Sequence, residues 1–141
     1  MIGETGVRFP STRREHGRVG DSLPMRELPG GGWEFLLEDP SLSSIRIDEQ
    51  SRLDLGGTEV VIGGPFLVRA DGMTHRLDPR RSEALGPLLS LFPGSLRWLW
   101  TSADGVLTAV FENGASLTVG PDPLREAWSV GSLYCPPTGG A

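Results

Sequence analysis

The chain has 141 residues, a net charge of −5 and a hydrophobic fraction of 38%, enough for one globular domain with its own core. Its 13 basic residues are all arginines, and the acidic balance argues against nucleic acid and anionic membrane as partners, because both favour a positive surface. The 20 glycines and 12 prolines favour short strands and turns over long helices.

Residues 1–32 are rich in arginine and glycine and follow neither the helical nor the strand period. We predict a disordered or loosely attached tail there, followed by a single domain over residues 33–141. Met25 offers an alternative start, in which case residues 1–24 do not belong to the natural protein. Because the N-terminus has no continuous apolar core and no apolar run is long enough to span a membrane, we expect a cytoplasmic protein.

The first apolar stretch after the tail, Trp33–Leu37, predicts a short strand or a single helical turn, and Ile45–Asp48 predicts a strand. A hairpin with a Gly-Gly turn follows over residues 51–62. A two-residue loop pairs Leu53 with Val60 and collects the large apolar side chains of both strands on one face.

A second hairpin is predicted over residues 65–77, around an Asp-Gly turn that pairs Val68 with His75. This register places His75 on the apolar face, where a histidine held by one hydrogen bond is expected before a metal ligand or a base. The other face, which carries Leu67 and Arg76, is expected to meet water.

Asp78–Phe92 predicts the one helix of the chain, beginning at Pro79 or at Glu83. Its apolar residues recur at i, i+3, i+4 and i+7, a spacing that makes one buried stripe of Leu85, Leu88, Leu89 and Phe92. Pro87 interrupts the pattern, so we expect a kink or a late start.

Leu96–Thr101 predicts a strand in which Trp98 and Trp100 share a face with Leu96, while Arg97 and Leu99 point the other way. Tryptophan fills cores and also dominates interface hot spots. We interpret the two tryptophans as core residues.

The clearest pattern of the chain is the hairpin over residues 105–120, with Asn113-Gly114 as its turn. A two-residue loop would split the large apolar side chains between the two faces. A three-residue loop pairs Phe111 with Ala115 and puts all of them on one face, so we predict that loop, with Gly114 left-handed in a bulge.

A final hairpin is predicted over residues 126–135, with a Gly-Ser turn that pairs Trp128 with Cys135. Cys135 is the only cysteine, which excludes an internal disulfide, and we expect an inert, partly buried thiol.

The hairpins over residues 51–62 and 105–120 have similar surroundings. Each follows a related phrase, Ser44-Ile45-Arg46 or Ser95-Leu96-Arg97, and each precedes a proline and a further hairpin. We therefore predict an α+β, mostly β fold, in which a duplicated antiparallel β-meander has one helix between the two copies.

Three phrases carry a family resemblance: residues 57–66, residues 77–79, and residues 114–119 followed by Asp122 to Trp128 with its Glu126-Ala127-Trp128. Over roughly residues 33–141 the chain resembles an actinobacterial family of small acidic β-rich domains of unknown function. The family often has an aromatic residue where this chain has Arg125, and the final hairpin is shorter here. The resemblance implies no assigned activity, although domains of this kind are suspected as immunity or accessory proteins for toxins.

No catalytic motif stands out. The chain has no glycine-rich phosphate loop, no zinc spacing of Cys and His, and no nucleophile elbow, so we assign no catalytic residue, no metal ligand and no cofactor. Whether the chain is an enzyme stays open, and the absence of these motifs favours the view that it is not one.

Two functions compete. The first is a binding protein of immunity or accessory type that contacts a basic protein partner, and the second is a small-ligand binder or enzyme with a pocket between the two repeats. A homodimer through the sheet edges is a third alternative. The candidate binding residues are His75, Arg97, Trp98, Trp100, Glu126 and Trp128.

Overall fold

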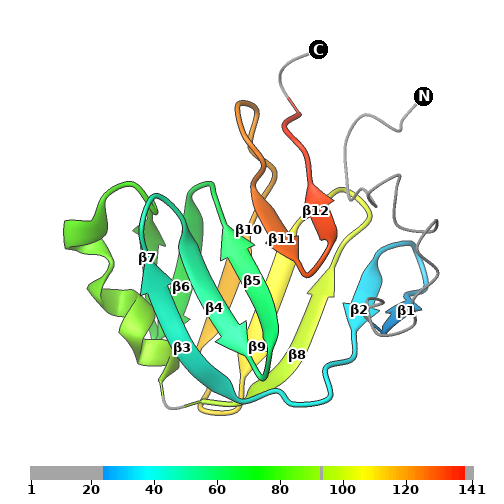
Figure 1. Ribbon diagram of the computed structural model, residues 1–141, viewed down its shortest axis with the longest axis horizontal. Helices are drawn as coiled ribbons and strands as arrows, with labels where there is room; N and C mark the ends of the chain where they lie inside the picture. The colour runs from blue at the N-terminus through cyan, green and yellow to red at the C-terminus, as the bar shows by residue number, and fades with distance from the viewer. Residues whose placement is uncertain (1–23, 93, 139–141) are drawn as a thin grey trace.

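A computed structural model of the protein describes residues 24–92 and 94–138, which form two antiparallel β-sheets packed face to face (Figure 1). In spatial order, the larger sheet contains β1 (Met25–Glu27), β2 (Trp33–Phe35), β8 (Leu96–Thr101), β9 (Leu107–Phe111), β10 (Ser116–Val119), β6 (Phe66–Ala70) and β7 (Met73–Leu77). The smaller sheet contains β12 (Leu133–Cys135), β11 (Trp128–Val130), β5 (Thr58–Ile62), β4 (Ser51–Leu55) and β3 (Leu42–Ile47). The prediction of a mostly β fold is confirmed.

The four predicted hairpins form with the predicted registers. Leu53 pairs with Val60, Val68 with His75, and Trp128 with Cys135. In the third hairpin the N–H of Phe111 donates to the carbonyl oxygen of Ala115 at 2.9 Å, and Gly114 is left-handed with φ +92°. The large apolar side chains of these strands meet between the sheets and form one core. Alternating apolar residues and the turn residues together specified these registers, because a slip by one residue would expose every core side chain.

Each sheet contains one three-stranded meander together with the hairpin that follows the other meander in the chain; we call this arrangement the exchange of hairpins. The meander β3-β4-β5 lies in the smaller sheet, but the hairpin β6-β7 that follows it pairs with β10 in the larger sheet. The meander β8-β9-β10 lies in the larger sheet, and the hairpin β11-β12 that follows it pairs with β5 in the smaller sheet. Reciprocal backbone bonds, from Leu42 N–H to Gly94 O at 3.0 Å and from Leu96 N–H to Pro40 O at 2.8 Å, join the starts of the two meanders.

The pairing corrects the alignment drawn between the two meanders. Leu42 lies opposite Leu55 at the start of β3, and Leu96 lies opposite Phe111 at the start of β8, so Leu42 and Leu96 occupy matching places. The similar phrases Ser44-Ile45-Arg46 and Ser95-Leu96-Arg97 therefore do not occupy equivalent positions. The structural equivalent of Leu96 is Leu42, three residues before Ile45. Both strands also carry a register shift at the same place, immediately after these leucines.

The predicted helix over residues 78–92 is wrong in type and in its buried face. Two short 3₁₀ helices, η3 (Ser82–Ala84) and η4 (Gly86–Leu91), take its place, and η4 contacts β6. Leu85, Leu88 and Leu91 are buried, whereas Leu89 is 57% exposed. A 3₁₀ helix has three residues per turn, so residues three apart share one face. Pro87 stands in the first turn of η4, where a missing N–H is tolerated.

The structured part of the chain begins before residue 33. Residues 25–27, which the sequence assigned to the tail, form β1 against β2, with Met25 packed on the core and Arg26 paired with Glu34. Residues 1–23 lie outside the described part of the chain. Within the described residues, none of the helices has the length and apolar character needed to cross a membrane.

Candidate functional site

A β-bulge in β8 decides where the two tryptophans of that strand point. The register shift falls between Leu96 and Trp98, so Leu96 and Leu99 both face the core. Trp98 and Trp100 consequently face outward, and Trp98 is 41% exposed. The prediction that both tryptophans are core residues on the face of Leu96 is therefore wrong, because one extra residue in a strand reverses the alternation beyond it.

The two indoles form a stacked pair on the outside of the larger sheet. Their ring centroids are 5.3 Å apart and their planes are inclined by 26°. Trp100 is half-buried, and its Nε1 atom is inaccessible to water without a hydrogen-bond partner among the described residues. An indole N–H is normally paired when buried. The pair thus combines apolar area with an unsatisfied donor.

The surroundings of this pair follow from the strand registers. Trp100 lies between Glu34 of β2 and Thr108 of β9, and Trp98 lies opposite Val110. We call the outward-facing side chains of β8, β9, β10, β6 and β7 the outer face; they are the exposed Arg97 in the bulge, Trp98, Trp100, Thr108, Val110, Ser116, Thr118, Leu67, Arg69, Thr74 and Arg76. A shallow hollow of about 250 Å³ adjoins Trp98, and Leu36, Pro40 and Arg97 contribute to its lining.

The outer face is basic although the chain is acidic. Arg69, Arg76 and Arg97 form no ion pair with any described residue, so their charges stand uncompensated there. The register of the hairpin over residues 65–77 predicts only that the face of Arg76 meets water. The hairpin register puts Arg69 and Arg76 on one face, but only the pairing of β6 with β10 puts them on the same sheet face as the tryptophans, three and four strand spacings from β8.

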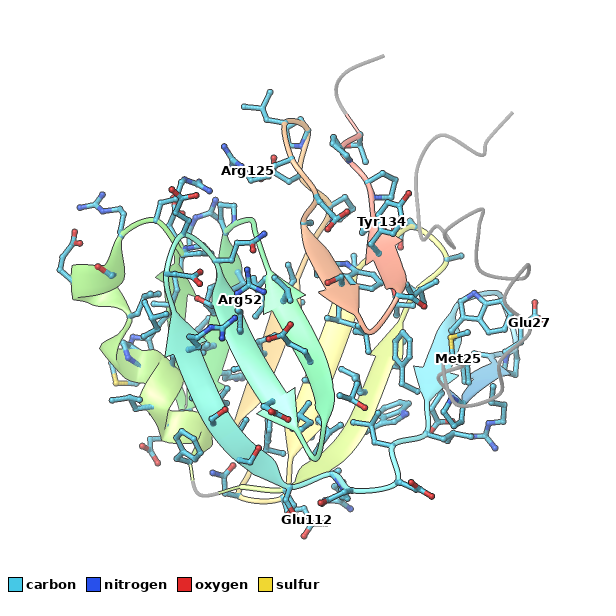
Figure 2. All side chains as sticks on the ribbon, in the orientation of Figure 1. Met25, Glu27, Arg52, Glu112, Arg125 and Tyr134 are labelled. Carbon is cyan, nitrogen blue, oxygen red and sulfur yellow. The ribbon has the colours of Figure 1, made fainter. Side chains whose placement is uncertain are left out.

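The outward side of the smaller sheet is different. Arg46 and Arg52 each lie within ion-pair distance of both Asp48 and Glu59, and Figure 2 shows Arg52 on this side of the molecule. The backbone N–H of Gln50, together with Arg52, lowers the pKa of the Asp48 carboxyl. The charges on this side are thus paired with one another, in contrast to the free arginines of the outer face.

The remaining candidate residues do not join the tryptophan pair. His75 is half-buried on the edge strand β7, opposite Val68. Trp128 is a core residue, 1% exposed, whose Nε1–H donates to the carbonyl oxygen of Gly105 at 2.8 Å. Glu126 lies at the surface just before β11, and the partial desolvation of its carboxyl there raises the pKa of that group. The structure therefore groups Arg97, Trp98 and Trp100 on β8 and separates His75, Glu126 and Trp128 from them.

The arrangement around the tryptophan pair offers contact area and charge. Among residues 24–92 and 94–138, no cluster of three or more His, Cys, Asp or Glu side chains could hold a metal ion. Cys135 is buried, and its burial together with the nearby Glu126 carboxylate raises the pKa of the thiol to about 11. A thiol of this kind stays protonated and is a poor nucleophile.

Comparison with known proteins identifies a family and no activity. The family of unknown function DUF6188 matches residues 33–139, and the chain belongs to this family. The match covers both sheets apart from β1, and it bears out the resemblance to a family of unknown function. No curated protein and no solved structure matches the chain.

Proposed function

We propose that this member of the family is a binding protein that contacts another protein through the outer face of the larger sheet. The observation that carries the proposal is the stacked pair of Trp98 and Trp100, turned outward by the bulge in β8. Tryptophan and arginine are the residues most enriched at binding hot spots, and both occur together on this face. An immunity-type or accessory role for another protein is a form of binding that suits such a surface.

The chain contains an internal control for this interpretation. We also propose that the two meanders descend from a duplication, which is supported by their reciprocal bonds and by the matching bulges in β3 and β8. At the places of Trp98 and Trp100, the strand β3 carries Ser44 and Arg46, which are exposed. The corresponding strand of the first meander therefore carries polar outward side chains where β8 carries the two indoles.

The charges of the outer face suggest what the partner offers. Composition alone favoured a basic partner, but the free guanidinium groups of Arg69 and Arg97 on this face favour an acidic segment of the partner protein. Arginine also forms planar, bidentate contacts with carboxylates. The proposed contact thus has an aromatic centre and a cationic rim.

The test is affinity capture from the native lysate with three forms of the full chain. The W98S/W100R variant gives β8 the outward side chains of β3, and V61S/Y134S makes a matched loss of apolar side chains from the outward side of the smaller sheet. We expect one stoichiometric partner with the wild type and with V61S/Y134S, and at least a tenfold loss with W98S/W100R, as hot-spot residues contribute about 2 kcal/mol or more. Far-UV circular dichroism confirms that each variant is folded. Recovery of the same partner by W98S/W100R, or of no partner by the wild type, contradicts the proposal.

A further inference from the structure

A second hollow, of about 380 Å³, opens at the other end of the outer face. Its floor is one row of outward side chains, Thr118 of β10, Leu67 of β6 and Arg76 of β7, which are paired across the sheet. The segment 120–123 and Pro65 form its walls. Thr118 lies in the same row as Trp100, two strand spacings or roughly 10 Å away, and Arg76 lies two spacings further, roughly 19 Å from Trp100. Neither tryptophan lines the hollow, which is therefore a separate site.

The walls come from the two segments that carry the exchanged hairpins from one sheet to the other. Pro65 lies in the connection from β5 to β6, and residues 120–123 lie in the connection from β10 to β11, whose far end carries Arg125 (Figure 2). Two of the wall residues in the second connection, Pro121 and Pro123, have a fixed φ. A hollow with walls of this kind is largely formed before a ligand arrives, which reduces the entropy lost on binding.

Asp122, the acidic side chain in the lining, is already engaged. It is 7% exposed, and its Oδ1 accepts hydrogen bonds from the N–H groups of Leu124 at 2.8 Å and Arg125 at 3.2 Å. Its Oδ2 pairs with the Arg125 guanidinium at 3.4 Å. Asp122 therefore holds the loop in shape, and its charge is offset by groups outside the hollow.

Arg76 is left as the free charge. It forms no ion pair with any described residue, and the other residues of the floor and rim offer apolar surface from Leu67, Val106 and Pro65, with one hydroxyl from Thr118. A guanidinium binds a carboxylate through two parallel N–H···O bonds. A bare inorganic anion would satisfy Arg76 but leave the apolar surface uncovered, whereas a neutral apolar molecule would leave the guanidinium without a partner.

We propose that this hollow binds a small carboxylic acid with an apolar body. The carboxylate pairs with the guanidinium of Arg76 and accepts a hydrogen bond from the hydroxyl of Thr118, while the body covers Leu67 and Val106. The volume is at the lower end of the range for small-molecule sites. The site lies between the two halves of the chain, but none of its lining residues belongs to the candidate set chosen from the sequence.

The experiment is a titration of the ¹⁵N-labelled full chain, followed by amide chemical shifts. The probes are benzoate and hexanoate, with benzamide as the neutral analogue of benzoate and inorganic phosphate as the bare anion. We expect saturable shifts for benzoate and hexanoate at the amides of Leu67, Arg76, Thr118 and Gly120. Loss of a charge-assisted pair should weaken binding at least about tenfold, both for benzamide and for benzoate on the R76Q variant.

The matched control is R69Q. Arg69 is the neighbouring free arginine of the outer face, but it does not line the hollow. R69Q should bind benzoate within about twofold of the wild type, and W98S/W100R should do so as well, which separates this site from the protein contact proposed above. The proposal is overturned by an absence of saturable shifts, by equal binding of benzamide or phosphate and benzoate, or by equal losses in R76Q and R69Q. Shifts that depend on protein concentration alone would assign the hollow to a second copy of the chain and would also overturn it.

Discussion

The buried indole of Trp128 provides a sharp test of the core. We expect W128F to lower the free energy of unfolding by about 3–4 kcal/mol. The change removes the donor to Gly105 O, and because Gly105 is buried its carbonyl loses the partner at 2.8 Å, which costs about 1–3 kcal/mol. It also removes two buried ring carbons, worth roughly 0.8 kcal/mol each.

The control makes the same chemical change at a different place. Trp98 is 41% exposed, so W98F should change the free energy of unfolding by less than about 1 kcal/mol, mainly through a weaker stack on Trp100. Urea unfolding followed by far-UV circular dichroism gives both values by linear extrapolation. Similar losses in W128F and W98F would refute the assignment of Trp128 to the core and Trp98 to the surface.

Two further predictions concern Cys135 and the 3₁₀ segment. Burial raises the pKa of the Cys135 thiol from 9.0 to about 11, so between these pH values the folded chain keeps a proton that the unfolded chain loses, and stability should fall as the pH rises through this range. The urea midpoint of the wild type should fall between about pH 8 and pH 10.5, and it should fall less in C135A. An equal fall in both proteins would contradict the assignment of this pH dependence to the Cys135 thiol. In the 3₁₀ segment, L88A should cost about 2–5 kcal/mol and L89A less than about 0.5, because Leu88 is buried and Leu89 is exposed. Equal losses would instead support the predicted α-helical stripe.

The local part of the fold was predictable from the sequence. All four hairpin registers came out as expected, because a turn residue such as Gly114 fixes the loop and the alternating apolar side chains admit one register each. The short strand at Trp33 was one of two alternatives, and the structure selects it. These features depend on residues close together in the chain.

The failures have two physical causes. In β8, the bulge after Leu96 leaves no mark on the pattern of apolar residues, because Leu96, Trp98 and Trp100 fit an unbroken strand equally well. In the helical segment, Leu88 and Leu89 are both compatible with a buried stripe, and the choice between three and 3.6 residues per turn decides which of them is covered. Each error moved side chains between the core and the surface.

The candidate site was less predictable than the fold, because it depends on pairing between distant segments. The pairing of β10 with β6 brings residues 116–118 next to residues 67–69. No local sequence pattern predicts this pairing. The predicted strand over residues 96–101, which carries Arg97, Trp98 and Trp100, is confirmed. The prediction was wrong about which way the indoles point, and His75, Glu126 and Trp128 were chosen by residue type without any means of placing them together.

The exchange of hairpins has a consequence for both proposed sites. Trp98 and Trp100 come from the second half of the chain, while Leu67 and Arg76 come from the hairpin that the first half contributes to the larger sheet. The outer face is therefore continuous only when β6 is paired with β10. A substitution that weakens the pairing of β6 with β10, but changes neither an indole nor a guanidinium, should impair the carboxylate site at Arg76 before it affects the tryptophan pair. The tryptophan pair is less affected because β8 and β9 belong to one meander. Arg76 is more affected because its position depends on the exchanged hairpin β6-β7.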